Sequence, residues 1–304
     1  MKALVTGGAG FIGSHLVDTL ISKGLTVHVI DNLSSGKRNF IHPSAIFHQT
    51  DITSLATQRI ILAEKPDYIF HMAAQADVSQ STLSPLEDLH INVAGTVNLL
   101  EACKHVKIKN FVFSSTSAVY GNVNIDKIDE AQPTFPISFY GLSKLTAERY
   151  IKLYNEAYNI PYSILRYGNV YGPRQTSKGE GGVIAVFLER LQQNEALKIN
   201  GDGLQTRDYI YVQDVVEANI AAAYKKINML MQISTGKKTS ILQLIDLIET
   251  NHAGQINRFH SADRQGDIKH SCLDNSLAKT KLKWKPAYTI EEGIKKTYHS
   301  YLST

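Results

Sequence analysis

The feature that most constrains the fold is a glycine-rich turn near the N-terminus, Thr6–Gly13 (Thr-Gly-Gly-Ala-Gly-Phe-Ile-Gly). A short apolar run, Ala3–Thr6, precedes the turn, and an amphipathic segment, Ile12–Lys23, follows it. The glycine spacing GxxGxxG is a variant of the dinucleotide-binding fingerprint, in which the backbone turns tightly and approaches a pyrophosphate at a helix N-terminus. We therefore expect a strand, a phosphate-binding turn and a helix, with a purely structural turn as the alternative.

An acidic residue stands where this kind of site needs one. Asp31 comes eighteen residues after Gly13, at the end of the second apolar run, Thr26–Ile30. A carboxylate there accepts hydrogen bonds from the adenosine ribose and repels a 2′-phosphate, which favours NAD over NADP. Lys37 and Arg38 lie nearby and act in the opposite direction. The alternative is an aspartate that only caps the turn.

The pattern beyond the turn predicts a doubly wound parallel sheet of the Rossmann type, because apolar runs alternate with segments of helical period. The expected strands are Ala3–Thr6, Thr26–Ile30, Ala45–His48, Tyr68–His71, Phe111–Ser114 and Tyr162–Arg166, and the expected helices are Ile12–Lys23, Ser54–Glu64, Leu86–Lys104 and Ser138–Asn159. Further on, the pattern predicts helices over Val183–Gln193, Val215–Lys225 and Ile241–Thr250 and a strand over Asp208–Val212. We expect an NAD-binding domain over 1–168, to which 208–234 returns, and a smaller interleaved α/β domain over 169–304 that binds the substrate.

Composition limits the other possibilities. Residues of the hydrophobic class make up 43% of the 304 residues and charged residues 20%, which excludes a disordered chain. The net charge of +4 is spread thinly along the chain, and basic residues cluster only in doublets such as Lys37-Arg38, so nucleic-acid binding is a weak alternative. The two cysteines form no CxxC pair, and there is neither a membrane-length apolar stretch nor a metal-binding histidine spacing. We expect a cytoplasmic enzyme with no metal and no membrane or nucleic-acid partner.

Tyr140 and Lys144 are candidates for acid–base chemistry. They open the segment Ser138–Asn159, and residues four apart share one face of a helix. A free tyrosine has a pKa of about 10, so deprotonation of a hydroxyl at neutral pH requires a shift of roughly three units, or about 4 kcal/mol. A neighbouring ammonium and a cationic nicotinamide ring can supply that shift. A chance tyrosine beside a surface lysine is the alternative.

A cluster of hydroxyl side chains follows the strand Phe111–Ser114, in the string Phe-Ser-Ser-Thr-Ser-Ala-Val-Tyr-Gly over 113–121. Hydroxyls at the carboxyl edge of a parallel sheet can hydrogen-bond a substrate alkoxide or carbonyl. They can equally satisfy the backbone of their own loop, and the sequence leaves both interpretations open.

Taken together, the glycine turn, Asp31, the hydroxyl cluster and the Tyr140/Lys144 pair resemble the extended short-chain dehydrogenase/reductase family. Within it the chain is most similar to the NAD-dependent epimerase/dehydratase branch, in particular the UDP-glucose and UDP-N-acetylglucosamine 4-epimerases. The matching strings are Asp31–Gly36, His71–Ala74, Asn92–Thr96, Arg166–Arg174, Gly201–Asp214 and Arg264–Asp267, so the similarity covers nearly the whole chain. The resemblance implies NAD-dependent inversion at C4 of a UDP-hexose through a transient 4-keto sugar.

The resemblance also assigns roles. It implies Tyr140 as the base, Lys144 as its electrostatic partner and Thr116 as the helper hydroxyl. The residues that it implies for NAD are Gly7, Gly10, Phe11, Ile12, Gly13, Asp31, Asn32, Ser35, Gly36, Asp51, Ile52, Ala73, Ala74, Asn92, Ser114, Tyr140, Lys144 and Tyr167. Those that it implies for the UDP-sugar are Thr116, Asn169, Val183, Arg207, Arg264, Asp267 and Ser271. It further implies a homodimer through 86–104 and 138–159.

Two positions narrow the expected reaction. Relatives that eliminate water carry an Asp-Glu pair after the strand-end threonine, whereas this chain has Ser117-Ala118. In the epimerases that the chain resembles, the residue at the position of Ser271 borders the 2-substituent of the sugar, and a bulky aromatic residue there excludes N-acetyl sugars. The resemblance therefore implies a pocket that admits them, unless a different loop length turns Ser271 away. A nucleotide-sugar decarboxylase or dehydratase and a non-catalytic NAD-sensing module remain as alternatives.

Overall fold

A seven-stranded parallel sheet forms the centre of the computed structural model, which describes residues 1–123, 125–177, 182–262 and 268–302. The strand order is β11-β6-β5-β4-β1-β2-β3, and every neighbouring pair is parallel. Every residue of β4 and β6 is buried, as expected for strands covered on both faces. The strands are β1 (Lys2–Thr6), β2 (Thr26–Asp31), β3 (Ile46–Gln49), β4 (Tyr68–His71), β5 (Asn110–Thr116), β6 (Tyr162–Tyr167) and β11 (Met229–Ile233). The predicted Rossmann-type fold is confirmed.

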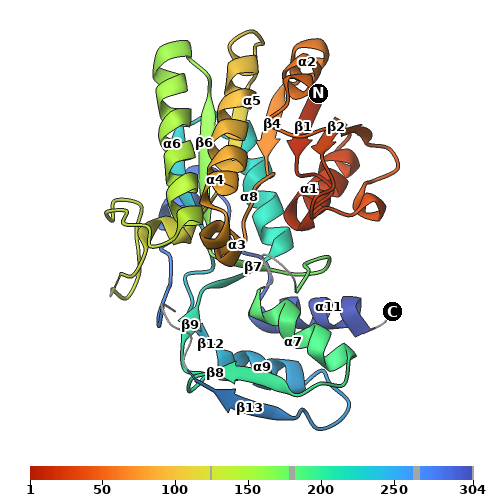
Figure 1. Ribbon diagram of the computed structural model, residues 1–304, viewed down its shortest axis with the longest axis vertical. Helices are drawn as coiled ribbons and strands as arrows, with labels where there is room; N and C mark the ends of the chain where they lie inside the picture. The colour runs from red at the N-terminus through yellow and green to blue at the C-terminus, as the bar shows by residue number, and fades with distance from the viewer. Residues whose placement is uncertain (124, 178–181, 263–267, 303–304) are drawn as a thin grey trace.

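Helices cover both faces of this sheet (Figure 1). One apolar core joins the sheet to α1 (Phe11–Ser22), α8 (Val212–Lys225) and α10 (Ser276–Leu282). A second core joins the opposite face to α2 (Leu55–Glu64), α5 (Gly95–Cys103) and α6 (Phe139–Tyr158). Shorter helical segments are η1 (Arg38–Phe40), α3 (Val78–Leu83), α4 (Pro85–Leu89), η2 (His90–Ala94) and η3 (Ser117–Tyr120).

A smaller unit with its own apolar core lies below the sheet in Figure 1. Its strands pair only two at a time, as β10 with β7, β12 with β9 and β13 with β8. Its elements are β7 (Asn169–Tyr171), α7 (Val183–Gln192), β8 (Leu197–Asn200), β9 (Thr206–Arg207), β10 (Tyr209–Tyr211), β12 (Thr239–Ser240), α9 (Ile241–Glu249), β13 (Arg258–Ser261) and α11 (Ile290–Leu302). The strand expected over Asp208–Val212 ends at Tyr211, because Val212 is already the first residue of α8.

The strand order reverses its direction at β1. From β1 the chain passes through α1 to β2 on one side, whereas β4 lies on the other side of β1. Ligands of open α/β sheets bind in the crevice at the carboxyl ends of the strands where this reversal occurs. Here the crevice lies between the glycine turn after β1 and the loop after β4.

Candidate active site

The glycine turn packs so closely on the loop after β4 that side chains are excluded. Gly7 has a φ of +69°, and a Cβ built on it would lie 2.6 Å from the backbone nitrogen of Ala73. A Cβ on Gly13 would collide with the backbone oxygen of Gly7. The turn and loop together border a cavity of about 450 Å³, which we call the glycine-turn cavity. The N-terminus of α1 opens beside it with no side-chain cap.

Asp31 organises the turn and faces the same cavity. Its Oδ2 accepts a hydrogen bond from the backbone N–H of Ala9 at 3.0 Å, and its Oδ1 accepts one from Leu33 at 2.8 Å. The capping interpretation and the ligand interpretation are therefore compatible, because each carboxylate oxygen can accept more than one hydrogen bond.

Many of the residues predicted for NAD line the glycine-turn cavity. They are Gly7, Gly10, Phe11, Ile12, Gly13, Asp31, Asn32, Ser35, Asp51, Ile52, Ala73 and Ala74. Gly36 lies against Ala9 and Asp31 at the edge of this set. Hydrogen bonds from Thr53 and Asn32 outweigh burial and lower the pKa of Asp51, which keeps that carboxylate ionised.

Sequence reasoning missed Arg174 and Gln175, which also line the cavity. Arg174 has a φ of +67° and forms an ion pair with Asp18 of α1 at 2.8 Å. Among the described residues, neither its buried Nη1 nor the buried Oε1 of Gln175 has a hydrogen-bond partner. A donor left unpaired beside a glycine turn and a helix N-terminus suits the pyrophosphate of a dinucleotide, so the residues present fit NAD. The only sequence signal was that Arg174 ends the string Arg166–Arg174.

Tyr140 and Lys144 lie on the first two turns of α6, next to the end of β5. Ser138 caps this helix by accepting a hydrogen bond from the backbone N–H of Gly141 at 3.1 Å. Lys144 is only 3% exposed, and its Nζ lies 4.6 Å from the ring centroid of Phe113. Thr116 ends β5, and its Oγ1 accepts from the backbone N–H of Ala118 at 3.1 Å. The two elements in contact thus carry the phenol, the ammonium and the hydroxyl.

Asn92 occupies a π-turn. The helix predicted over Leu86–Lys104 is interrupted by η2, a π-turn of the kind often found at functional sites. The Asn92 amide is buried there and accepts a hydrogen bond from Gln75 N at 2.9 Å. It donates to Asp88 Oδ1 at 3.1 Å and to Ser143 Oγ at 3.0 Å. Asn92 therefore links the loop after β4 to the residue that precedes Lys144.

Besides Gly36, five of the residues predicted for NAD do not line the glycine-turn cavity, namely Asn92, Ser114, Tyr140, Lys144 and Tyr167. Ser114 is buried and donates its hydroxyl to the backbone oxygen of His71 at 3.0 Å. The Tyr167 hydroxyl donates to Asn219 Oδ1 at 2.9 Å within the core shared by the sheet and α8. Neither side chain lines the glycine-turn cavity.

Apart from Thr116 of β5, the described residues that were predicted for the UDP-sugar come from the smaller unit. Asn169 is exposed at the start of β7, Val183 begins α7, and Arg207 lies in β9 with its Nη1 donating to Thr206 O at 2.9 Å. Ser271 donates its backbone N–H to Thr206 O at 3.1 Å, which places it beside β9. Arg264 and Asp267 lie outside the described residues.

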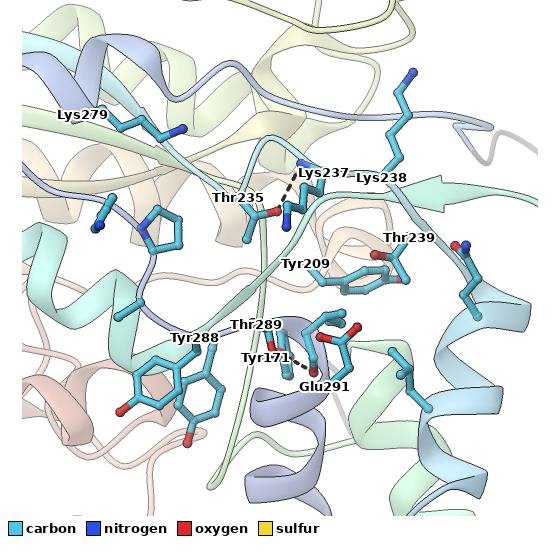
Figure 2. A pocket seen from close by; sticks show the side chains of 17 residues that line it. Tyr171, Tyr209, Thr235, Lys237, Lys238, Thr239, Lys279, Tyr288, Thr289 and Glu291 are labelled. Atoms are coloured by element: carbon cyan, nitrogen blue, oxygen red, sulfur yellow. Dashed lines mark hydrogen bonds between the residues drawn. The ribbon is translucent and has the colours of Figure 1, made fainter.

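A second cavity, of about 530 Å³, lies between β10, the start of α9 and 285–291. Figure 2 shows the Tyr209 ring near its centre and Lys237 and Lys279 above that ring. None of the predicted site residues lines this cavity.

Other features of the described chain concern its cysteines, metals and helices. Cys103 and Cys272 are free and buried, and burial raises the pKa of both thiols. Within the described residues, no group of three or more His, Cys, Asp or Glu side chains is placed to hold a metal ion. No helix in that part of the chain has the length and apolar character to cross a membrane.

Comparisons with known proteins agree with the observed fold. The sequence profile of the NAD dependent epimerase/dehydratase family matches residues 3–233. The UDP-glucose 4-epimerase of Mycolicibacterium smegmatis is 38% identical over 313 residues, which cover 98% of this chain and 97% of that protein. The crystal structure of UDP-glucose 4-epimerase from Thermotoga maritima with UDP-glucose is 42% identical, with a TM-score of 0.94 and coverage of 100% and 99%. The UDP-N-acetylglucosamine 4-epimerase of Methanobrevibacter ruminantium, in complex with UDP-N-acetylmuramic acid, is 37% identical, with a TM-score of 0.95 and coverage of 99% and 98%.

Proposed function

Because the chain belongs to the NAD-dependent epimerase/dehydratase family, we propose that it inverts C4 of a UDP-hexose through a transient 4-keto sugar. The observation that carries this proposal is the placement of Tyr140 and Lys144 on the first turns of α6, next to Thr116. A built Cβ on Gly141 would lie 2.6 Å from the backbone oxygen of Ala118, so the helix and the strand end are in close contact.

The first domain, 1–168 with 208–234, holds the cofactor in this proposal. The glycine turn and Arg174 bind the pyrophosphate, Asp31 binds the adenosine ribose, and Asp51 and Ile52 flank the adenine. When bound, NAD accepts the C4 hydride and returns it, so the reaction has no net oxidation.

The chain's own residues move the proton. Tyr140, as the phenolate, takes the O4 proton of the sugar, and the Lys144 ammonium stabilises that phenolate. Thr116 accepts from Ala118 N and donates its hydroxyl hydrogen to the sugar oxygen. Arg207 holds the diphosphate while the flat 4-keto sugar turns, so that the hydride returns to the opposite face. Tyr140 then gives the proton back to O4.

The sugar pocket admits an N-acetyl group in this proposal. Ser271 is small and lies beside β9, which also carries Arg207. We therefore propose UDP-glucose/UDP-galactose and UDP-GlcNAc/UDP-GalNAc as substrate pairs. Ser117 and Ala118 provide no carboxylic acid for the elimination of water, which speaks against a dehydratase.

Product analysis tests the function. Purified protein is incubated separately with UDP-glucose, UDP-GlcNAc, UDP-glucuronate and dTDP-glucose, and the products are identified by NMR. We expect UDP-galactose from the first and UDP-GalNAc from the second. Loss of carbon dioxide or water would instead identify a decarboxylase or dehydratase. Retained NAD without any product would identify an NAD-sensing module.

We also propose a cytoplasmic homodimer. Large apolar side chains are exposed on adjacent helices, with Leu86 of α4 at 78% and Leu153 of α6 at 58% exposure. Burying such side chains against a second copy is favourable by about 25 cal/mol per Å² of apolar surface. Light scattering should give the mass of a dimer, and L86E/L153E should give that of a monomer. The free thiols of Cys103 and Cys272 suit a reducing compartment.

A further inference from the structure

A buried ion pair lies behind the proposed catalytic residues. Glu148 of α6 and Arg166 of β6 are 1% and 4% exposed. Glu148 Oε1 accepts from Arg166 Nε at 2.8 Å, and Oε2 accepts from Nη2 at 2.6 Å. Such a bidentate pair fixes the relative orientation of the two side chains as well as their distance, which a single hydrogen bond does not.

The pair is tied to the strand that ends in Thr116. Ser115 donates its hydroxyl to Glu148 Oε1 at 2.5 Å. Ser115 and Arg166 are register partners of β5 and β6, and Gln232 of β11 is the partner of Arg166 on its other side. A row of three polar residues therefore crosses three neighbouring strands of the sheet beneath α6.

The cationic end of the pair is also enclosed. The Arg166 guanidinium lies 4.8 Å from the ring centroid of Tyr120, and Gln232 Nε2 donates to the Tyr120 hydroxyl at 2.7 Å. The guanidinium is thus held on several sides by elements that do not belong to α6.

Stability alone is a poor explanation for such a pair. Desolvation of two buried charges often cancels their attraction, and apolar replacements of both partners are frequently neutral or stabilising. The apolar contacts of α6, through Ala147 and Ile151, already provide its packing. The two hydrogen bonds between Glu148 and Arg166 also fix the rotation of α6 about its axis and its distance from the sheet. Glu148 lies one helical turn after Lys144 and two after Tyr140, so this constraint reaches both residues.

We propose that the Glu148–Arg166 pair, together with Ser115, is the positioning device that keeps Tyr140 and Lys144 aligned with Thr116. The pair does not touch the substrate and acts through these three residues. This inference rests on the proposed epimerase function. It gives Arg166 and Ser115 a role that cofactor binding at the glycine turn does not explain.

The decisive variant is E148M/R166M, which replaces both charges with unbranched apolar side chains. We expect a folded protein with unchanged NAD affinity and KM. We expect kcat for UDP-glucose to fall on the order of tenfold to a hundredfold, as small displacements of reacting groups do. With substrate deuterated at C4, the isotope effect on kcat should increase, because a misaligned site slows hydride transfer.

R166K and N110A complete the design. R166K keeps the charge but loses the fork, so its kcat should fall between wild type and the double variant. Asn110 is a buried polar residue at the far end of β5, bonded to Ser163 at 3.0 Å, so N110A should lower stability without changing kcat.

The outcomes separate this inference from the function on which it rests. A wild-type kcat and isotope effect in E148M/R166M would overturn it; if that variant does not fold, a wild-type kcat in R166K overturns it instead. Wild-type protein inactive on every UDP-hexose would refute the proposed function itself and remove the basis of this inference.

Discussion

The two sides of the proposed active site are built in different ways. On the NAD side, backbone forms much of the wall: Gly7 and Gly13 have no room for a side chain, and α1 opens without a side-chain cap. On the sugar side, the proposed contacts come from single side chains: Arg207 belongs to β9, which pairs only with β12, and Ser271 lies in the loop beside β9. Cofactor binding therefore follows from the topology of the sheet, whereas the choice of sugar depends on individual residues that can change without altering the fold.

Tyr140 is the proposed base, and its replacement should have the largest effect. We expect Y140F to lower kcat about a thousandfold, because removing the phenol removes general acid–base catalysis. NAD should stay bound, since the glycine turn is untouched; bound NAD is measured after gel filtration. Loss of NAD together with activity would show that the Tyr140 phenol contributes to NAD binding. Full activity would refute the assignment of Tyr140 as the base.

Gly7 tests whether the NAD side depends on backbone shape. G7A should weaken NAD binding on the order of a hundredfold. The new methyl group collides with the backbone of Ala73 and pushes the glycine turn away from the loop after β4, where the crevice of the sheet lies. The matched control is G24A: Gly24 has a φ of +79° but nothing within 4 Å of a built Cβ. Both variants carry the same strain of about 1–2 kcal/mol. Calorimetry should show weakened NAD binding for G7A alone; equal losses would mean that strain, and not close packing, is responsible.

Ser271 tests the sugar side. S271Y should reduce kcat/KM for UDP-GlcNAc at least about tenfold relative to UDP-glucose, because a phenol ring occupies the space of the acetamido group. NAD binding and the thermal midpoint should not change, since Ser271 lies outside both cores of the large sheet. An equal loss with both sugars would show that the side chain does not border the 2-substituent.

This difference also explains which features were predictable from the sequence. Gly7, Gly13 and Asp31 were predictable because the required backbone shape dictates the residue type, and the strands were predictable because both of their faces are buried. Arg174 reaches the same cavity only because the loop after β7 returns to α1, where it pairs with Asp18. Arg174 also has a left-handed φ, and an arginine in the sequence gives no indication of that backbone conformation.

Long-range side-chain contacts could likewise not be predicted from the periodicity of the sequence. Glu148 and Ser115 are 33 residues apart, and a helical pattern over Ser138–Asn159 does not indicate which strand its polar residues will meet. The chain stays helical on both sides of the π-turn at Asn92, so the sequence predicted one continuous helix. These features depend on contacts between elements and not on the pattern within one of them.

Replacement of His71, which ends β4 beside the glycine turn, should have the smallest effect, and the effect concerns stability. The ring is 1% exposed and lies between Thr6 Oγ1, 2.7 Å from Nδ1, and Thr96 Oγ1, 3.0 Å from Nε2. Thr96 donates its hydroxyl to Asn92 O at 2.6 Å, so we assign Nε2–H as the donor to Thr96 and Nδ1 as the acceptor from Thr6. That arrangement suits a neutral imidazole, and burial, reinforced by the Lys144 charge, lowers the pKa of His71 well below its ordinary value.

The consequence for stability has a definite sign. Below about pH 6.5 the unfolded chain binds a proton on this histidine that the folded chain does not, so the free energy of unfolding falls as the pH falls. One such group contributes a slope of up to about 1.4 kcal/mol per pH unit. Chemical denaturation at pH 7.5 and 5.5 should show a smaller pH dependence for H71Q than for wild type, because glutamine can bond both threonines without titrating. Burial also lowers the pKa of His15 and His28, and their shared contribution cancels in this comparison. An unchanged slope in H71Q would mean that His71 is protonated in the folded chain, and the backbone-built side would then carry a buried charge next to Lys144.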